Sequence, residues 1–154
     1  MTRWNTQQSA VLSIACTWAA LALAVGGAVA LPFLPRLGHV GSLPVFGILI
    51  RQEWPAMYLC IAGGMAALIL LLKVLYSIKD GAVFTSDNVA RLRWISYCGF
   101  AIAGIALITG LIDGTWLGWG PIGLVAAFLG LIMRVVKNVI DAARVLKEES
   151  DFTI

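Results

Sequence analysis

The side chains that could carry out acid–base chemistry are few, and they lie far apart in the sequence. His39 is the only histidine, and Asp113 stands at the end of a long apolar run. An imidazole and a carboxylate can work together as acid and base only within hydrogen-bond reach, about 3 Å. One hypothesis is therefore an enzyme that uses this pair. The alternative is a solvated loop histidine and an interfacial acid that caps a helix or binds a proton or cation.

Other reactive patterns are missing from the sequence. One histidine cannot supply two imidazole ligands for haem or a metal within one chain. Cys16, Cys60 and Cys98 lie singly in separate apolar runs, with no Cys-x-x-Cys pair, and are typical of small apolar side chains. No glycine-rich phosphate loop follows a strand. We therefore expect no enzyme activity, no metal and no cofactor.

The elements that must position these residues are membrane helices. The 154 residues are 60% hydrophobic and 12% charged, with a mean hydropathy of +0.92, whereas soluble domains are about 25% charged. A span needs about 20 apolar helical residues, and the alternating pattern of a barrel is absent. The sequence predicts one all-α domain, a four-helix transmembrane bundle over 1–154. Its expected spans are about 9–31, 54–72, 94–112 and 119–136.

The positive charges predict the orientation of this bundle. Nine Lys and Arg residues flank the spans on one side, and only Arg36 and Arg51 lie on the other. The positive-inside rule then places both termini and the 73–93 loop in the cytoplasm. Ala28–Ala30 resembles a signal-peptidase site. The single basic residue before this long run favours a retained helix, and cleavage would leave three helices with the same topology.

Small residues recur four apart within the spans and predict close helix packing. We expect packing inside one bundle, and a homo-oligomer face is the alternative. The pairs are Ala22/Gly26, Gly26/Ala30, Gly63/Ala67, Gly99/Ala103, Gly123/Ala127 and Ala126/Gly130. Four tryptophans near the run ends suit interfacial anchoring, with a plain lipid-facing or packing role as an equal alternative: Trp54, Trp94, Trp116 and Trp119.

The polar stretch 81–93 predicts a helix end followed by a new helix. Gly81 can adopt the left-handed conformation that ends a helix, and Thr85 or Ser86 can cap the next one. Asn88 lies about one turn outside the membrane, where it can bond to the loop or to a neighbouring helix end. Arg91 and Arg93 can reach lipid phosphates or the acids of a partner. An ordinary helical hairpin is the simpler interpretation.

The last predicted helix continues beyond the membrane as an amphipathic tail over about 137–154. Its apolar face can lie on lipid, pack on the 73–93 loop, or bind a partner helix. The acids at 148, 149 and 151 argue against flat lipid binding at the end. The terminal apolar residues, Phe152 and Ile154, suit capture as an added strand.

Two stretches resemble an uncharacterised bacterial family of four-helix membrane proteins, the domain of unknown function 2975. The matching positions are Gly81, Phe84, Thr85, Asn88, Leu92 and Arg93, and near the end Leu146, Glu149, Asp151, Thr153 and Ile154. Phe152 departs from the Leu-like residue of that pattern. The resemblance implies a gene neighbour of the Cro/C1 helix-turn-helix type. It carries over no catalytic residue.

These observations favour a non-enzymatic membrane protein whose loop and tail engage a soluble partner, for which a nearby helix-turn-helix transcription regulator is the candidate. We expect no direct contact with nucleic acid. The alternatives are a binder or transporter of small lipophilic molecules, and a subunit of a larger membrane complex. The candidate partner-binding residues are Phe84, Asn88, Arg91, Arg93, Arg144, Phe152 and Ile154.

Overall fold

The computed structural model describes residues 6–33, 54–81 and 84–152. A short 3-10 helix, η1 (Leu31–Phe33), follows the first of four long α-helices. These are α1 (Thr6–Ala30), α4 (Trp54–Lys79), α5 (Ser86–Asp113) and α6 (Trp116–Phe152). Each of the four is long and apolar enough to cross a membrane, and the described residues contain no strand. The predicted all-α membrane fold is confirmed.

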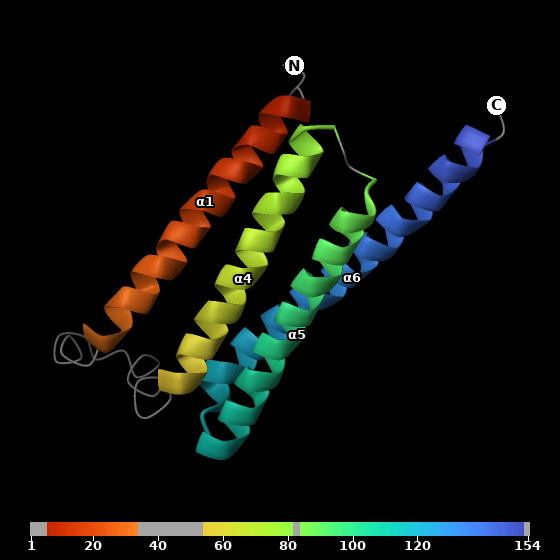
Figure 1. Ribbon diagram of the computed structural model, residues 1–154. Coiled ribbons are helices and arrows are strands. Elements are labelled where there is room, and N and C mark those ends of the chain that lie inside the picture. Colours follow the sequence, from red (N-terminus) through yellow and green to blue (C-terminus); the bar gives the residue numbers. More distant parts are fainter. Residues whose placement is uncertain (1–5, 34–53, 82–83, 153–154) are drawn as a thin grey trace, which may run out of the picture.

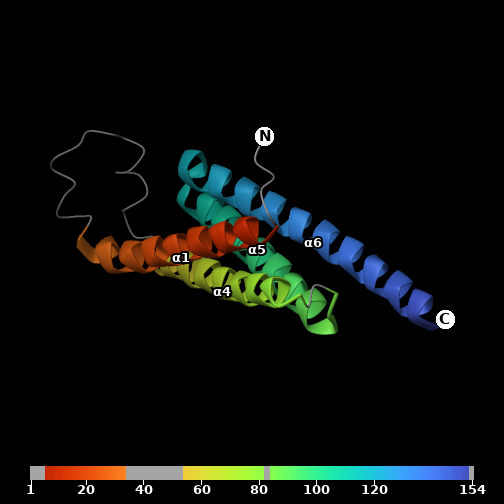
Figure 2. The ribbon, with the colours of Figure 1, turned by 90° about the horizontal axis from the view of Figure 1, so that it is seen from above.

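The helices pack in chain order. α1 packs on α4, α4 on α5, and α5 makes the most extensive contact with α6. Figure 1 shows that α1 begins, α4 ends, α5 begins and α6 ends at one end of the array, which we call the termini end. The opposite end, where α5 turns into α6, is the hairpin end. Seen from above, α1 and α4 lie side by side and α6 extends well past the other helices (Figure 2).

Three helices continue past their predicted spans at the termini end. α4 runs on to Lys79, α5 starts at Ser86, and α6 continues without a break to Phe152. Gly81 has a positive φ of 80° immediately after α4, as predicted for a helix-ending glycine. Gly114 ends α5 in the same way with a φ of 67°, a position that the sequence analysis did not single out. The predicted extension of the last helix is therefore confirmed.

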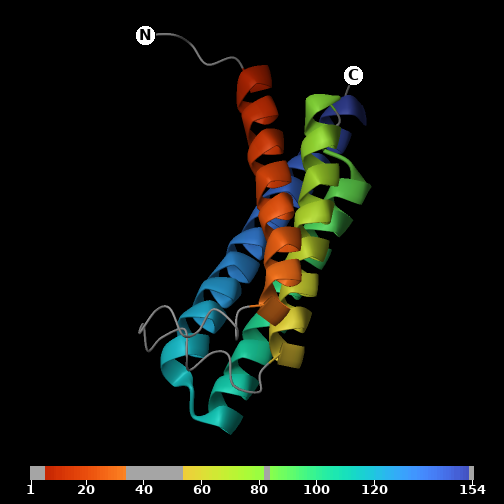
Figure 3. The same cartoon turned by 90° about the vertical axis from the view of Figure 1, so that its left-hand side faces the viewer.

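Figure 3 shows α6 running obliquely behind the other helices. Small residues line the crossing between α5 and α6. A Cβ atom on Gly99 would lie 3.0 Å from both the Ala126 carbonyl oxygen and the Gly130 Cα atom. The buried Ser96 hydroxyl donates a hydrogen bond to the Gly130 carbonyl oxygen at 2.9 Å. Close backbone approach and an interhelical hydrogen bond are what hold helices together in lipid. The small-residue pairs at this crossing thus pack inside one chain, as expected.

Trp119 closes the same helix pair at the hairpin end. Its side chain is 1% exposed, and its Cβ lies 3.3 Å from the Cβ position of Gly110. Trp119 therefore packs between the helices and does not anchor the chain at the membrane interface. Trp94 and Trp116 are exposed, in keeping with the anchoring role. Hydropathy alone could not separate them, because an indole fits both environments.

Gly99→Ala should destabilise the protein by about 1–3 kcal/mol, because the added methyl group meets backbone atoms that must shift. The matched control is Gly104→Ala, since a Cβ there meets nothing within 4 Å. Unfolding by SDS in mixed micelles measures both variants against the parent. Equal stability of the two variants would contradict a tight crossing at Gly99.

Candidate functional site

A hydrogen-bond network joins the end of α4 to the start of α5. Asn88 is 1% exposed, and its Nδ2 donates to the Ser77 hydroxyl at 3.0 Å. The Arg91 guanidinium donates to Asn88 Oδ1 at 3.2 Å and to the Lys73 carbonyl oxygen at 3.3 Å. A buried amide requires such partners, because an unsatisfied one is costly. The network therefore fixes how the two helix ends sit against each other.

The connection between these helices, residues 80–85, is called the elbow. Gly81 N–H donates to the Ile78 carbonyl oxygen at 3.0 Å, which closes the last turn of α4. Thr85 occupies the N-cap position of α5 in an extended conformation. Its carbonyl oxygen accepts from the N–H groups of Asn88 and Val89, while its side chain makes no capping bond. Asp87 supplies the negative charge that favours a helix start.

The network borders an open polar groove of about 470 Å³. The groove lies between the end of α4 and the start of α5 and is lined by Lys73, Tyr76, Ser77, Asp80 and Arg91. Arg91 therefore makes two kinds of contact. It donates a hydrogen bond to the buried Asn88, and it also lines this groove. Two other lining residues, Lys73 and Asp80, are exposed charges that can meet a polar ligand surface.

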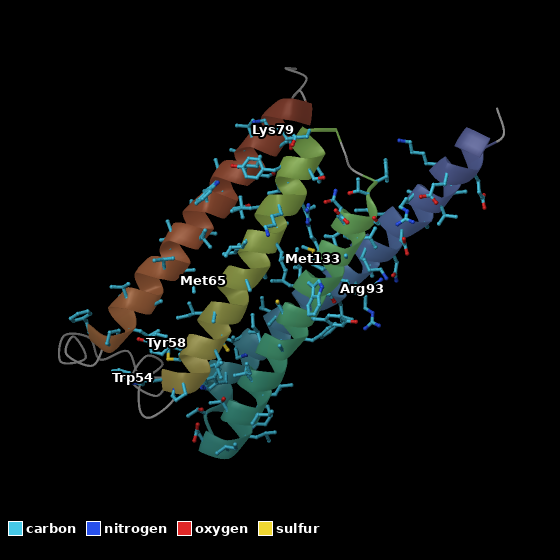
Figure 4. All side chains as sticks on the ribbon, viewed as in Figure 1. Trp54, Tyr58, Met65, Lys79, Arg93 and Met133 are labelled. Atoms are coloured by element: carbon cyan, nitrogen blue, oxygen red, sulfur yellow. The ribbon has the colours of Figure 1, made fainter. Side chains whose placement is uncertain are left out.

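A smaller basic pocket of about 60 Å³ lies at the α5–α6 crossing, on the side away from α4. Its lining residues are Arg93, Ser96, Tyr97, Arg134 and Lys137. Three cations and no acid line this pocket, so it favours an anionic group. Figure 4 shows Arg93 near this crossing and Met133 on the side that faces α4. This pocket and the groove between α4 and α5 open on two sides of α5, and we refer to the two together as the basic surface.

The structure brings together only some of the candidate partner-binding residues. Arg91 and Arg93 lie on the basic surface, and Phe84 is 43% exposed beside them in the elbow. Asn88 is buried, so in this structure its amide holds two helices together and presents no surface. Arg144 lies further along α6 and pairs with Glu148 at 3.0 Å within its own helix.

The remaining candidates fall at or beyond the edges of the described chain. Phe152 is the last residue of α6, and Ile154 lies outside the described residues. Asp113 is exposed at the end of α5, while His39, its partner in the enzyme hypothesis, also lies outside them. Within 6–33, 54–81 and 84–152, no cluster of His, Cys, Asp or Glu could hold a metal ion.

The sequence analysis did not locate an apolar groove of about 340 Å³ between α4, α5 and α6. Its walls include Gly64 and Ala67 of α4, Gly99 and Ile102 of α5, and Met133 of α6. Four of the residues recognised as packing positions thus also line an open space: Ala67, Gly99, Ala126 and Gly130. Their small size was the available indication, but the sequence did not say which faces remain unfilled.

Asn88→Leu should destabilise the protein by about 1–3 kcal/mol, because Ser77 and Arg91 each lose a hydrogen bond to the amide. The matched control is Asn138→Leu, the same change at an exposed position of α6. Hydrogen exchange of the membrane protein should show faster exchange at the end of α4 and the start of α5 only in Asn88→Leu. Unchanged exchange there would show that the network does not hold the elbow.

Comparison with known proteins adds a family but no described activity. No curated protein and no solved structure matches the chain. Residues 54–154 match the family described as "Protein of unknown function (DUF2975)". The match covers α4, the elbow, α5 and α6, and so includes the hydrogen-bond network, the basic surface and the apolar groove. The resemblance expected from the elbow and the chain end is confirmed, and the protein belongs to the DUF2975 family.

Proposed function

We propose that this protein is a non-enzymatic protein of the bacterial cytoplasmic membrane that binds a soluble protein at its basic surface. The observation that carries the proposal is the buried hydrogen-bond network between the end of α4 and the start of α5. A buried network fixes the start of α5, and this helix then presents Arg93 to the same pocket as Arg134 and Lys137 of α6. A surface held in place before binding loses little entropy when a partner docks.

The charge of the basic surface supports an acidic partner surface. Three cations line the pocket, and Lys73 and Arg91, together with the acid Asp80, line the groove between α4 and α5. The distribution of Lys and Arg, nine at the termini end and two in the connection between α1 and α4, supports a cytoplasmic location for this end. A soluble cytoplasmic protein would meet the basic surface there. Electrostatic attraction would favour its approach.

The family resemblance supports a helix-turn-helix transcription regulator as that partner. In this proposal the regulator binds through an acidic face and is held at the membrane, away from DNA. The predicted spans contain no Asp, Glu, His or Lys, and their one arginine, Arg134, lies two residues before the end of the fourth span, which supports a role without catalysis. The membrane protein itself would make no contact with nucleic acid.

Arg93→Gln should weaken co-purification of the neighbouring regulator with the full-length protein and change the output of the regulator's promoter. The substitution removes one of three cations in the basic pocket while leaving the elbow network intact. The matched control is Lys147→Gln, the same loss of charge at an exposed residue near the end of α6. Promoter activity and pull-down yield are measured together.

A cytoplasmic reporter fused to the C-terminus checks that neither substitution reverses the topology. Equal pull-down yields for Arg93→Gln and Lys147→Gln, or no regulator recovered with the parent protein, would overturn the proposal. If anionic lipid alone occupies the pocket, Arg93→Gln will change the lipids that co-purify and leave the promoter unchanged.

The apolar groove favours a second candidate function, the binding of a lipophilic molecule. The groove is about 340 Å³, within the range of small-molecule sites, and almost all of its lining is apolar. It is partly open, so a molecule dissolved in the bilayer can enter from the side. Its walls include Gly99, at the tight α5–α6 crossing, so an occupant would contact residues that position α6.

Gly64→Leu should abolish photolabelling of the groove by a fatty acid that carries a diazirine in its chain. A Cβ at Gly64 meets nothing within 4 Å, so the larger side chain fills the groove and leaves the backbone in place. The control is Gly27→Leu in α1, which is equally open and lies outside the groove. Labelling mapped by mass spectrometry to Ile102 and Met133 would support the site, and equal labelling of both variants would exclude it.

A further inference from the structure

One face of α6 carries a regular series of exposed apolar residues. They follow one another at alternating intervals of three and four, the spacing of the a and d positions in a coiled-coil heptad. Valine, isoleucine and leucine occupy the a positions. We call the whole series the seam. The seam consists of Val125, Phe128, Ile132, Val135, Val139, Ala142 and Leu146.

The charges of α6 avoid the seam. Every charged residue between positions 125 and 148 falls at heptad position b, c or f, which face away from a coiled-coil partner. These residues are Arg134, Lys137, Asp141, Arg144, Lys147 and Glu148. The e and g positions beside the seam are apolar or neutral, so two parallel copies would place no like charges against each other.

The seam is not the face that packs on α5. The α5 contact uses Trp119, Gly123, Ala126 and Gly130, and none of these belongs to the seam. The large seam residues are all exposed, from 38% at Ile132 to 66% at Leu146. This chain therefore leaves the seam uncovered along its whole length.

Lipid accounts for the exposure of only part of the seam. Val139, Ala142 and Leu146 lie beyond the predicted span, which ends at about Val136. α6 has its only proline at Pro121, near its start, and continues unbroken to Phe152. The segment past Val136 therefore projects about 24 Å beyond the span, at about 1.5 Å per residue. An exposed apolar stripe there favours a protein neighbour, because the acids at 148, 149 and 151 oppose binding of the helix end to an anionic lipid surface.

We infer that the seam pairs with the seam of a second copy of this chain, as a parallel coiled coil that begins in the membrane and continues beyond it. Two copies inserted with the same topology have parallel α6 helices, so a two-fold axis along the membrane normal brings the seams together. β-branched residues occupy the a positions Val125, Ile132 and Val139, and a two-fold pair is the commonest closed assembly of identical chains. Glu149 falls at the next d position and ends the seam.

This pairing uses a different face of α6 from the basic surface. Arg134 and Lys137, which line the basic pocket with α5, stand at positions c and f. The dimer therefore leaves both basic surfaces open and is independent of the proposed function. It would present two copies of the basic surface in a fixed, symmetric arrangement.

Cysteine cross-linking in membranes tests the inference on the full-length chain, in a background where Cys16, Cys60 and Cys98 are replaced by alanine. Single cysteines are placed at Val139 and Ala142 on the seam, and at Asp141 and Arg144 as matched controls on the opposite face. A disulfide needs Cβ atoms about 4 Å apart, so mild oxidation should give at least about tenfold more dimer at 139 and 142 than at 141 and 144.

Equal yields at the four positions, or no dimer at 139 and 142, would overturn the inference. The first result would indicate random collision, and the second a seam covered by lipid or another protein. Co-purification of two differently tagged, otherwise unchanged copies provides a measurement that needs no cysteine. Val139→Glu should reduce the recovered partner copy at least about tenfold, because it places like charges at the centre of the seam. Unchanged recovery would also overturn the inference.

Discussion

The structure depends on the close approach of two helix backbones at Gly99 and Gly130. In lipid, apolar side chains gain little by leaving their surroundings, so association rests on dispersion contacts and on interhelical hydrogen bonds. The crossing supplies both, since the missing side chains let the helices meet and Ser96 bonds across the contact. The direction in which α6 leaves the array, and with it the basic pocket, follows from this one contact.

The sequence predicted where the helices lie, but it did not predict which of their faces meet lipid and which meet another helix. Four apolar runs define four spans, and Gly81 marks the end of α4 through its conformational freedom. Hydropathy cannot tell a lipid neighbour from a protein neighbour, because both are apolar. Trp119 therefore read equally well as an interfacial or a packing residue, and only the structure placed it against Gly110.

Asn88 illustrates the same limit at the edge of the membrane. Its type and position fit a surface contact or an internal hydrogen bond, and only the facing residues of α4 decide between them. Ser77 lies opposite and turns the amide inward. Arg93, five residues further along α5, lines the basic pocket, and its contact with a partner stays a prediction. A pattern of residue types thus located the region of the candidate site, and the packing of α4 on α5 selected which members face outward.

α6 is a single helix of 37 residues, and its close contacts with α5 lie in its first half. From Gly130 to Phe152 it extends about 33 Å, at about 1.5 Å per residue. A rotation of about 10° at the crossing would therefore move its free end by about 6 Å, about one helical turn. The apolar groove is lined by residues of this crossing. A small change in what occupies the groove could therefore rotate α6 slightly at the crossing and displace its far end by several ångströms.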